Sequence, residues 1–338
     1  MTDYFRPLVQ IGPARPDTAL PLAGGWGWFT HAEVLSRSTP PRVVPAADIP
    51  ASVMARLTAP RPAMAGLTLD RPRIMGILNT TPDSFSDGGQ HNAVPDALRV
   101  AQEMVAAGAD ILDIGGESTR PGADFVPVSE EITRTAPVIA ALRGAGLHTP
   151  ISIDTRKAAV AEAAVSAGAN LVNDVSGFTF DPALGPLCQK LALPVCVMHA
   201  QGDPATMHLD PQYDNVLLDV FDALERQISM LEASGIPRGA ILADPGIGFG
   251  KTQDHNLALL ARLSLFHALG TPILLGVSRK RFIGTIGNAP QAQDRAPGSI
   301  AVALAGLGQG VQMIRVHDVD DTRQAVALWH AAYFGSIL

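Results

Sequence analysis

Ile74-Met-Gly-Ile-Leu-Asn79 is the first of eight short apolar runs, each of which ends in or beside a polar residue. A loop and an amphipathic segment, often closed by a glycine, separate one run from the next. Strands that alternate with helices in this way predict right-handed βαβ crossovers and a parallel sheet. Eight such units predict an α/β protein of the (β/α)8 TIM barrel class. The eight runs are 74–78, 111–114, 151–153, 171–172, 195–198, 241–243, 273–277 and 313–314.

The segment after the first run has the spacing of one buried helix face. Pro95 lies in what would be the first turn of this helix, where its missing N–H is tolerated. Gly108 and Gly168, each in an Ala-Gly-Ala context, are expected at left-handed positions just beyond a helix. The apolar residues follow the i, i+3, i+4, i+7 pattern and are Val94, Ala97, Leu98, Ala101, Met104 and Val105.

Residues 1–66 differ from these repeating units. They contain many prolines and little sustained periodicity, but also Trp26 and Trp28, and disordered segments rarely use aromatic residues in this way. We expect an N-terminal extension of unknown role that packs on the barrel or on a partner, with short elements at 29–35 and 52–57. Residues 67–338 would form the barrel domain.

The composition limits the partners and the compartment. The 338 residues carry a net charge of −7, which argues against nucleic acid as the main partner because phosphate binding usually shows a basic excess. No apolar stretch reaches the ~20 residues that cross a bilayer, and the N-terminus has no secretory signal pattern. Cys188 and Cys196 lie in apolar context and are expected to be buried thiols. We expect a cytoplasmic protein without a membrane partner.

Three carboxylates are expected at the C-terminal ends of strands, which form the active face of such a barrel. They are Asp113, Asp154 and Asp244. Carboxylates grouped in this way can accept hydrogen bonds from the donor edge of a nitrogen heterocycle.

The loop 79–89 after the first run is long for a connection of this kind. It contains Asn79, Asp83, Ser84 and Asp87, which are oxygen ligands suited to Mg²⁺ beside a phosphate. Its turn-forming residues also fit a simple turn. The sequence favours the metal and phosphate interpretation.

The loop 115–122 after the second run is rich in glycine, which allows backbone N–H groups to approach an anion. Ser118, Thr119 and Arg120 add donors. An ordinary glycine-rich loop is the alternative interpretation.

Basic residues follow the seventh and eighth runs, in Ser278-Arg-Lys-Arg281 and Arg315-Val-His317. Phosphate sites of TIM barrels often lie after these two strands, so the sequence predicts an anion site there.

Gly250-Lys251-Thr252 resembles the end of a nucleotide P-loop. That motif requires a further glycine five residues before Gly250, and position 245 is proline. We therefore reject the P-loop and interpret 244–252 as an aspartate at a strand end followed by a glycine-rich turn that carries Phe249.

These motifs, in this order, resemble those of the dihydropteroate synthase family over about residues 67–338. Thr80 and Arg281 depart from the residues that are usual in the family. The matching motifs are Gly76-Ile-Leu-Asn-Thr-Thr-Pro-Asp-Ser-Phe-Ser-Asp-Gly-Gly89, Asp113-Ile-Gly-Gly-Glu-Ser-Thr-Arg-Pro-Gly122, Ser152-Ile-Asp-Thr155, Asn173-Asp-Val-Ser-Gly177, Met198-His199, Asp244-Pro-Gly-Ile-Gly-Phe-Gly-Lys251, Ser278-Arg-Lys280 and Arg315-Val-His-Asp318.

The resemblance implies condensation of 6-hydroxymethyl-7,8-dihydropterin pyrophosphate with p-aminobenzoate, with Mg²⁺ as cofactor and Asn79 as its ligand. The implied catalytic residues are Asn79, Asp113, Asp154, Asp244 and Lys280. The implied pterin ligands are Asp154, Asn173, Met198, Asp244 and Lys280. The implied pyrophosphate ligands are Asn79, Thr119, Arg120, Arg315 and His317. The implied p-aminobenzoate pocket consists of Phe85, Thr119, Pro121, Phe249 and Arg281.

The resemblance also implies a homodimer through the later helices, to which the apolar segment 300–307 adds modest support. Two other functions remain open at this stage. A pterin-dependent methyltransferase on the same kind of barrel would need no pyrophosphate site. A catalytically silent relative would act only as a binding partner.

Overall fold

The computed structural model describes residues 3–81, 93–118, 125–202 and 210–337. At its centre, eight parallel strands pair in the order β11-β10-β9-β8-β7-β6-β13-β12. A parallel bridge between Ala243 of β11 and Ile273, just before β12, joins the two ends of this order and closes the predicted barrel. The strands are β6 (Arg73–Asn79), β7 (Ile111–Gly115), β8 (Ile151–Asp154), β9 (Leu171–Asp174), β10 (Val195–Met198), β11 (Ile241–Asp244), β12 (Leu274–Leu275) and β13 (Met313–Val316).

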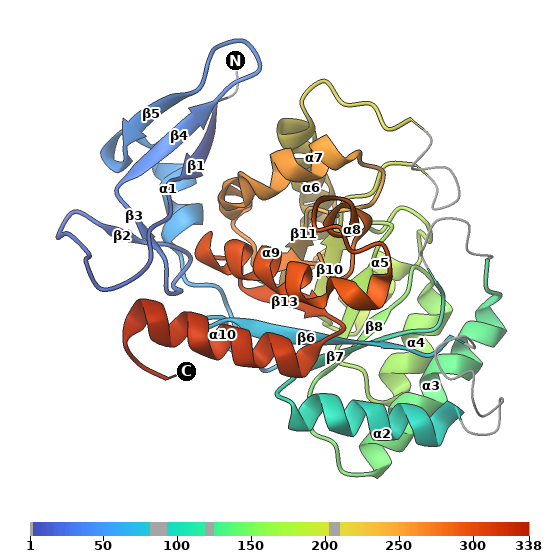
Figure 1. The fold of residues 1–338 in the computed structure, drawn as a ribbon. Coiled ribbons are helices and arrows are strands. Elements are labelled where there is room, and N and C mark those ends of the chain that lie inside the picture. Colours follow the sequence, from blue (N-terminus) through green and yellow to red (C-terminus); the bar gives the residue numbers. More distant parts are fainter. Residues whose placement is uncertain (1–2, 82–92, 119–124, 203–209, 338) are drawn as a thin grey trace.

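Helices surround the barrel (Figure 1). The predicted helix over 94–105 is confirmed as α2, and Gly108 and Gly168 have the positive φ angles expected of them, 98° and 119°. The helices are α2 (Ala93–Ala106), α3 (Val128–Gly144), α4 (Ala158–Ala167), α5 (Leu184–Lys190), α6 (Val216–Ala233), α7 (Gln253–Leu260), α8 (Arg281–Ile286), α9 (Ala296–Gly308) and α10 (Val319–Phe334), with 3-10 turns η3 (Arg238–Ala240), η4 (Leu263–Leu269) and η5 (Ala292–Arg295).

Strand β12 is shorter than the run 273–277 that predicted it. Its ladder with β13 ends at Leu275, and the next residue is Gly276, which has no side chain to pack. The chain then turns at Arg279, which has a φ of 58°, and enters α8. Strand propensity at 276–277 is thus overridden by the turn that leads to the next helix.

The barrel interior is apolar where the strands begin. One buried cluster there includes Met64 and Leu69, which precede β6. Met64 and Leu67 form an antiparallel bridge, so this short hairpin packs against the first inward layer of strand residues. The boundary predicted after residue 66 falls inside this hairpin. The strand residues of the cluster are Met75, Ile111, Leu171, Cys196, Leu242, Leu274 and Met313.

The N-terminal extension folds around a three-stranded antiparallel sheet in the order β1-β4-β5. The elements expected at 29–35 and 52–57 are present, but the sequence did not predict the rest of this sheet. In the extension, three short strands end at a proline, and a further proline precedes the helix. These positions tolerate a missing N–H. The elements are β1 (Tyr4–Pro7), β2 (Leu20–Pro21), β3 (Trp28–Phe29), β4 (His31–Leu35), β5 (Arg42–Pro45), η1 (Ala46–Asp48) and α1 (Ala51–Thr58).

The extension packs on the helical layer of the barrel, beside α9 and α10 in Figure 1. The Tyr4 hydroxyl donates to the carboxylate of Asp222 on α6, at 2.9 Å. On the other side, the Trp26 indole N–H donates to the carbonyl of Leu307 and its ring meets Trp329 edge to face, with centroids 6.4 Å apart. The extension is therefore fixed to both α6 and the α9–α10 pair.

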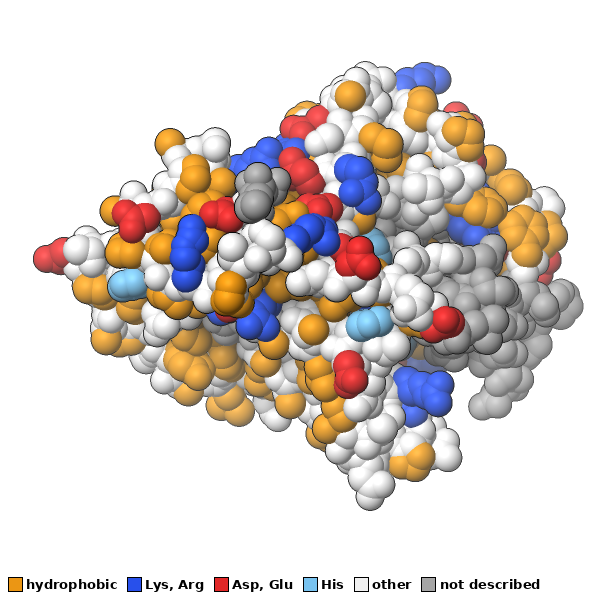
Figure 2. Space-filling view, turned by 90° about the horizontal axis from the view of Figure 1, so that it is seen from above, with side chains coloured by type: hydrophobic (Ala, Val, Ile, Leu, Met, Phe, Trp, Pro, Cys, Tyr) orange, Lys and Arg blue, Asp and Glu red, His pale blue; other side chains and the backbone are white. Residues whose placement is uncertain are grey.

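The surface carries both signs of charge. On the face shown in Figure 2, basic and acidic side chains are interspersed, with no basic stripe. Over the described ranges, the structure contains no helix with both the length and the apolar character needed to cross a membrane.

Candidate active site

The inward-facing residues become polar at the C-terminal ends of the strands. The strand pleat sends every second side chain into the barrel, and the position two residues beyond the apolar layer is Asp113 on β7, Asn173 on β9 and Asp244 on β11. All three are buried. The structure thus brings together, as predicted, Asn79, Asp113, Asp154, Asn173, Met198, Asp244 and Arg315 at one end of the barrel.

Arg315 joins two of the predicted carboxylates. Its Nε donates to Asp113 Oδ2 at 2.5 Å, and its Nη2 donates to Asp154 Oδ2 at 2.7 Å. Asn173 Nδ2 donates to the same Oδ2 of Asp113 at 3.1 Å. Burial alone would lower the pKa of the guanidinium, but the two carboxylates raise it, so Arg315 stays charged.

One carboxylate oxygen of this group is available to a ligand. Asp113 Oδ1 is buried and has no hydrogen-bond partner among the residues that the structure describes. Burial raises the pKa of Asp154 against the opposing charge of Arg315. A buried acceptor without a partner is costly, so a donor from a bound molecule would stabilise Asp113.

Asp244 ends β11 and is oriented by its own loop. The N–H of Gly246 donates to Asp244 Oδ1 at 2.7 Å. Gly276 lies beside the other oxygen, since a side chain there would place its Cβ 3.6 Å from Oδ2. Burial raises the pKa of Asp244 to about 6, although Gly246, Lys280, Lys251 and Arg315 oppose the shift. The carboxylate is therefore mostly ionised at neutral pH, and its Oδ2 lies beside Gly276.

Lys280 and Phe249 form one wall of the site. The Lys280 Nζ lies over the Phe249 ring, 4.0 Å from its centroid, in the geometry of a cation–π contact. Arg281, the next residue, is exposed at the start of α8. Of the predicted pocket residues that are described, Phe249 lies at the site and Arg281 lies at its rim.

Three residues of the segments after β12 and β13, where the sequence predicts an anion site, have partners within the chain. Arg279 is taken up in an ion pair with Asp318, and Arg315 pairs with the carboxylates. His317 is held by Ser278, whose Oγ lies 2.9 Å from the imidazole Nδ1 and accepts the His317 backbone N–H at 3.1 Å. Arg279 and Arg315 both form ion pairs within the chain, and the anion site after the two strands stays a prediction.

Asn79 ends β6 opposite Gly115 of β7. Its side-chain oxygen lies 3.9 Å from the place where a Cβ on Gly115 would lie. Among the described residues, no group of three or more His, Cys, Asp or Glu side chains could hold a metal ion. The predicted residues Phe85, Thr119, Arg120 and Pro121 lie outside the described residues.

Sequence reasoning missed a charged network beside the site. Glu117 pairs with Arg156 at 3.0 Å and with Lys157 at 3.1 Å, and it accepts the N–H of Val126 at 3.1 Å. Lys157 also pairs with the fully buried Glu131 at 2.6 Å. Glu117 and Val126 lie on either side of residues 119–124, so their hydrogen bond joins the chain before and after that segment. The charged residue in Gly-Gly-Glu117-Ser was the available signal. The sequence analysis assigned roles only to the donors that follow it.

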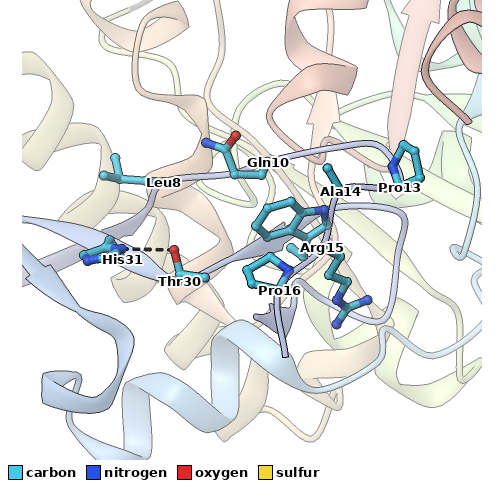
Figure 3. Close-up of a pocket in the computed structure, with 9 residues that line it drawn as sticks. Leu8, Gln10, Pro13, Ala14, Arg15, Pro16, Thr30 and His31 are labelled. Atoms are coloured by element: carbon cyan, nitrogen blue, oxygen red, sulfur yellow. Dashed lines mark hydrogen bonds between the residues drawn. The ribbon is translucent and has the colours of Figure 1, made fainter. Parts of the chain in front are cut away.

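Two surface hollows are lined by described residues. One, of about 760 Å³, is lined by extension residues, including Leu8, Arg15, Thr30 and His31 (Figure 3). The other, of about 430 Å³, lies between Arg37 of the extension and the segment after β10. None of the predicted site residues lines either hollow.

Comparison with known proteins gives consistent results. Residues 75–317 match the family model described as pterin binding enzyme. The dihydropteroate synthase of Escherichia coli K12 is 45% identical over 255 residues, which cover 75% of this chain and 89% of that protein. The solved dihydropteroate synthase of Xanthomonas albilineans with 4-aminobenzoic acid is 44% identical, with a TM-score of 0.74 over 79% of this chain and 96% of that one. The Yersinia pestis dihydropteroate synthase in a sulfonamide drug complex is 46% identical, with a TM-score of 0.75 over 80% and 98% of the chains.

Proposed function

The chain belongs to the dihydropteroate synthase family of pterin binding enzymes, and we propose how its own residues carry out the reaction. The enzyme is a transferase of folate biosynthesis. It condenses 6-hydroxymethyl-7,8-dihydropterin pyrophosphate with p-aminobenzoate, which gives 7,8-dihydropteroate and pyrophosphate.

The observation that carries the assignment of roles is the set of buried acceptors at the strand ends. Asp244 has one oxygen directed at the space beside Gly276, and Asp113 has an oxygen without a partner among the described residues. An aminopyrimidine edge offers N–H donors that match such acceptors. We assign Asp154, Asn173, Met198, Asp244 and Lys280 to the pterin, with Asp113 supporting them through its bonds to Arg315 and Asn173.

The leaving pyrophosphate would lie on the side of Arg315 and His317. A guanidinium has five N–H donors, and the two contacts with Asp113 and Asp154 use two of them, so Arg315 can also donate to a phosphate oxygen. His317 is fixed through Ser278 at the neighbouring strand end. We assign Asn79, Thr119 and Arg120 to the same group on the sequence motifs alone.

We propose a magnesium ion that is held partly by the protein and partly by the phosphates of the substrate. Mg²⁺ usually keeps several waters and takes one or two protein oxygens together with substrate phosphates. Asn79, at the end of β6, would supply the protein oxygen. Mg²⁺ neutralises charge on a leaving pyrophosphate when it is bound.

The reaction depends more on the positioning of the two substrates than on proton transfer by the protein. The amine nitrogen of p-aminobenzoate forms a bond to the pterin methylene carbon while the bond from that carbon to the pyrophosphate oxygen breaks, and pyrophosphate leaves with the electron pair. The arylamine is neutral near pH 7 and loses its proton to solvent after the bond forms. The residues of the site hold the two substrates in line and stabilise the departing charge.

We assign p-aminobenzoate to Phe249 and Arg281, and on the sequence motifs alone also to Phe85, Thr119 and Pro121. A sulfonamide has the same ring and amine, and the Yersinia pestis relative was solved with such a drug. We therefore expect sulfamethoxazole to compete with p-aminobenzoate in this enzyme. Steady-state inhibition at several p-aminobenzoate concentrations tests this, and an unchanged rate at saturating drug and low p-aminobenzoate would refute the pocket.

The function is tested by incubating the full chain with both substrates and Mg²⁺. We expect equal amounts of 7,8-dihydropteroate and pyrophosphate, and neither product when one substrate is omitted. A protein that forms no pyrophosphate but transfers a methyl group would be the related methyltransferase. The dihydropteroate synthase relatives, 44% and 45% identical over 75% of this chain, favour the synthase.

We also propose a homodimer and a cytoplasmic location. Apolar side chains remain exposed on α10, including Leu328 and Tyr333, next to the apolar α9. The extension contacts this face at Trp26, and its Gly12 lies beside the backbone of Tyr333. Light scattering should give the mass of two chains at micromolar concentration. The free, buried thiols of Cys188 and Cys196 are consistent with a reducing compartment.

A further inference from the structure

Lys251 is a buried lysine to which the motifs give no role. It follows the glycine-rich turn after β11, and only 4% of its surface is exposed. Its Nζ lies within hydrogen-bond distance of four neutral acceptors, which are the carbonyls of Gly246 at 2.9 Å, Phe249 at 3.0 Å and His199 at 3.2 Å, and the His199 Nδ1 at 3.0 Å. Backbone and imidazole acceptors thus surround the ammonium group.

The glycines of this turn allow the carbonyls to converge. Gly246 and Gly250 have φ angles of 68° and 59°, in the left-handed region. A Cβ on Gly246 would lie 1.9 Å from the carbonyl oxygen of His199, and one on Gly250 would lie 2.4 Å from that of Gln201. The turn after β11 therefore wraps around Lys251 and packs with its backbone directly on the segment after β10.

The protonation states of the two partners are complementary. Burial lowers the pKa of His199 to about 3, with Lys251 adding to the shift, so the imidazole is neutral and can accept a hydrogen bond. Burial also lowers the pKa of Lys251 to about 7, while Asp244 opposes that shift. The ammonium form of Lys251 donates to these acceptors.

The turn that Lys251 holds carries two groups of the site. The N–H of Gly246 orients Asp244, and the ring of Phe249 lies under Lys280. Lys251 binds the carbonyl of each of these two turn residues. A shift of the turn would therefore displace the Asp244 carboxylate and the Phe249 ring together.

We propose that Lys251 is a positioning residue of the reaction, which fixes Asp244 toward the pterin and Phe249 toward the arylamine by binding the carbonyls of the turn between them. This inference rests on the proposed function. Lys251 touches neither substrate in this account, so its effect must appear through the placement of Asp244 and Phe249.

The test compares Lys251→Met with Lys190→Met in the full chain. Lys190 ends α5 and is exposed, so its replacement removes the same charge at a surface position. A displacement of about 1 Å can reduce catalysis on the order of a hundredfold. We expect Lys251→Met to raise the KM for pterin pyrophosphate about tenfold or more, with a fall in kcat, and Lys190→Met to match the unaltered enzyme.

A purely structural role gives a different result. It would lower the melting temperature and the folded fraction, which reduces the apparent kcat and leaves both KM values unchanged. That outcome overturns the inference. If Lys251→Met does not fold, Lys251→Arg takes its place, because it keeps the charge but its larger head displaces the turn. A raised KM for pterin pyrophosphate supports the inference, and unaltered KM values overturn it.

Failure of the proposed function has its own signature. If the unaltered chain and Lys190→Met form no dihydropteroate, the function is wrong and the inference falls with it. If both are active and the Lys251 variants share their KM values, only the inference is wrong.

Discussion

The barrel interior has two layers that are built from the same strands and have opposite chemistry. Near the strand beginnings, the inward residues are apolar; two residues further along, four of the strands carry a polar or charged residue. Leu242 and Asp244 of β11 show the contrast within a single strand. The corresponding pairs on other strands are Ile111 and Asp113, Leu171 and Asn173, and Met313 and Arg315.

The difference separates stability from chemistry. Burial of each large side chain in the apolar layer contributes about 1.5–3 kcal/mol. The polar layer removes several charges from water, and desolvation of each ion costs several kcal/mol unless partners offset it. Its energetic balance depends on the bonds of Arg315 to Asp113 and Asp154. The apolar layer therefore supports a site that the fold would not favour by itself.

Removal of the shared cation should have the largest effect. Arg315→Met leaves Asp113 and Asp154 buried without their counter-charge, and breaking a buried ion pair typically costs about 3–5 kcal/mol. Urea denaturation should show a loss of that size. Arg99→Met, which breaks an exposed pair with Glu103 on α2, is the control and should cost less than about 1 kcal/mol. An equally small loss of stability in both variants would mean that Arg315 does not offset the cost of burying Asp113 and Asp154.

The apolar layer should respond in stability alone. Leu242→Ala removes a fully buried side chain, and such a truncation costs about 2–5 kcal/mol. We expect denaturation curves to shift by that amount while the KM for pterin pyrophosphate of the folded protein stays the same. A changed KM would show that the two layers are not independent.

The pKa of Asp244 predicts a pH dependence of pterin binding. Burial raises this pKa to about 6, and Asp244 accepts N–H donors fully only when it is ionised. Pterin affinity should therefore fall about tenfold between pH 7 and pH 5. The contribution of this carboxyl to folding stability should change in the opposite direction, because a raised pKa means that the folded state binds the proton more tightly than the unfolded state.

Titration calorimetry across this pH range checks the prediction. Asp244→Asn has no titrating group at this position, so its weaker binding should lose this part of the pH dependence. Equal slopes in both proteins would assign the pH dependence to another group.

Arg281 belongs to neither layer and should have the smallest effect. It is exposed at the start of α8, where the screening of charge by water keeps interactions below about 1 kcal/mol. Arg281→Ser should leave pterin affinity unchanged and alter the KM for p-aminobenzoate by less than about fivefold. A larger change in steady-state kinetics would place the guanidinium on the arylamine.

The sequence predicted the barrel and most of the polar layer because both follow from regular spacing. Eight apolar runs with polar ends determine the strands, and the two-residue period of a strand places Asp113 and Asp244 inside. Partner choice does not follow from spacing. The bonds of Arg315 to two carboxylates, and of Arg279 to Asp318, join residues far apart in the chain.

Two further features could not be predicted from the sequence patterns. Lys251 looked like the remnant of a rejected P-loop, since only the folded turn shows that its ammonium group is surrounded by carbonyls. The three-stranded antiparallel sheet of the extension is made of strands four or five residues long, which are too short for a clear alternation. Its packing on α6 and α9 depends on tertiary contacts such as Tyr4 with Asp222.

The central claim is that the charged layer binds the pterin while the apolar layer beneath it only holds the barrel. Calorimetric titration of pterin pyrophosphate into Asp244→Asn and Leu242→Ala, which lie two residues apart on β11, tests it most directly. The account predicts that Asp244→Asn loses about 2–4 kcal/mol of binding free energy, as for a charged hydrogen bond broken on one side, and that folded Leu242→Ala binds like the unaltered protein. Unchanged binding by Asp244→Asn, or an equal loss in both variants, would contradict it.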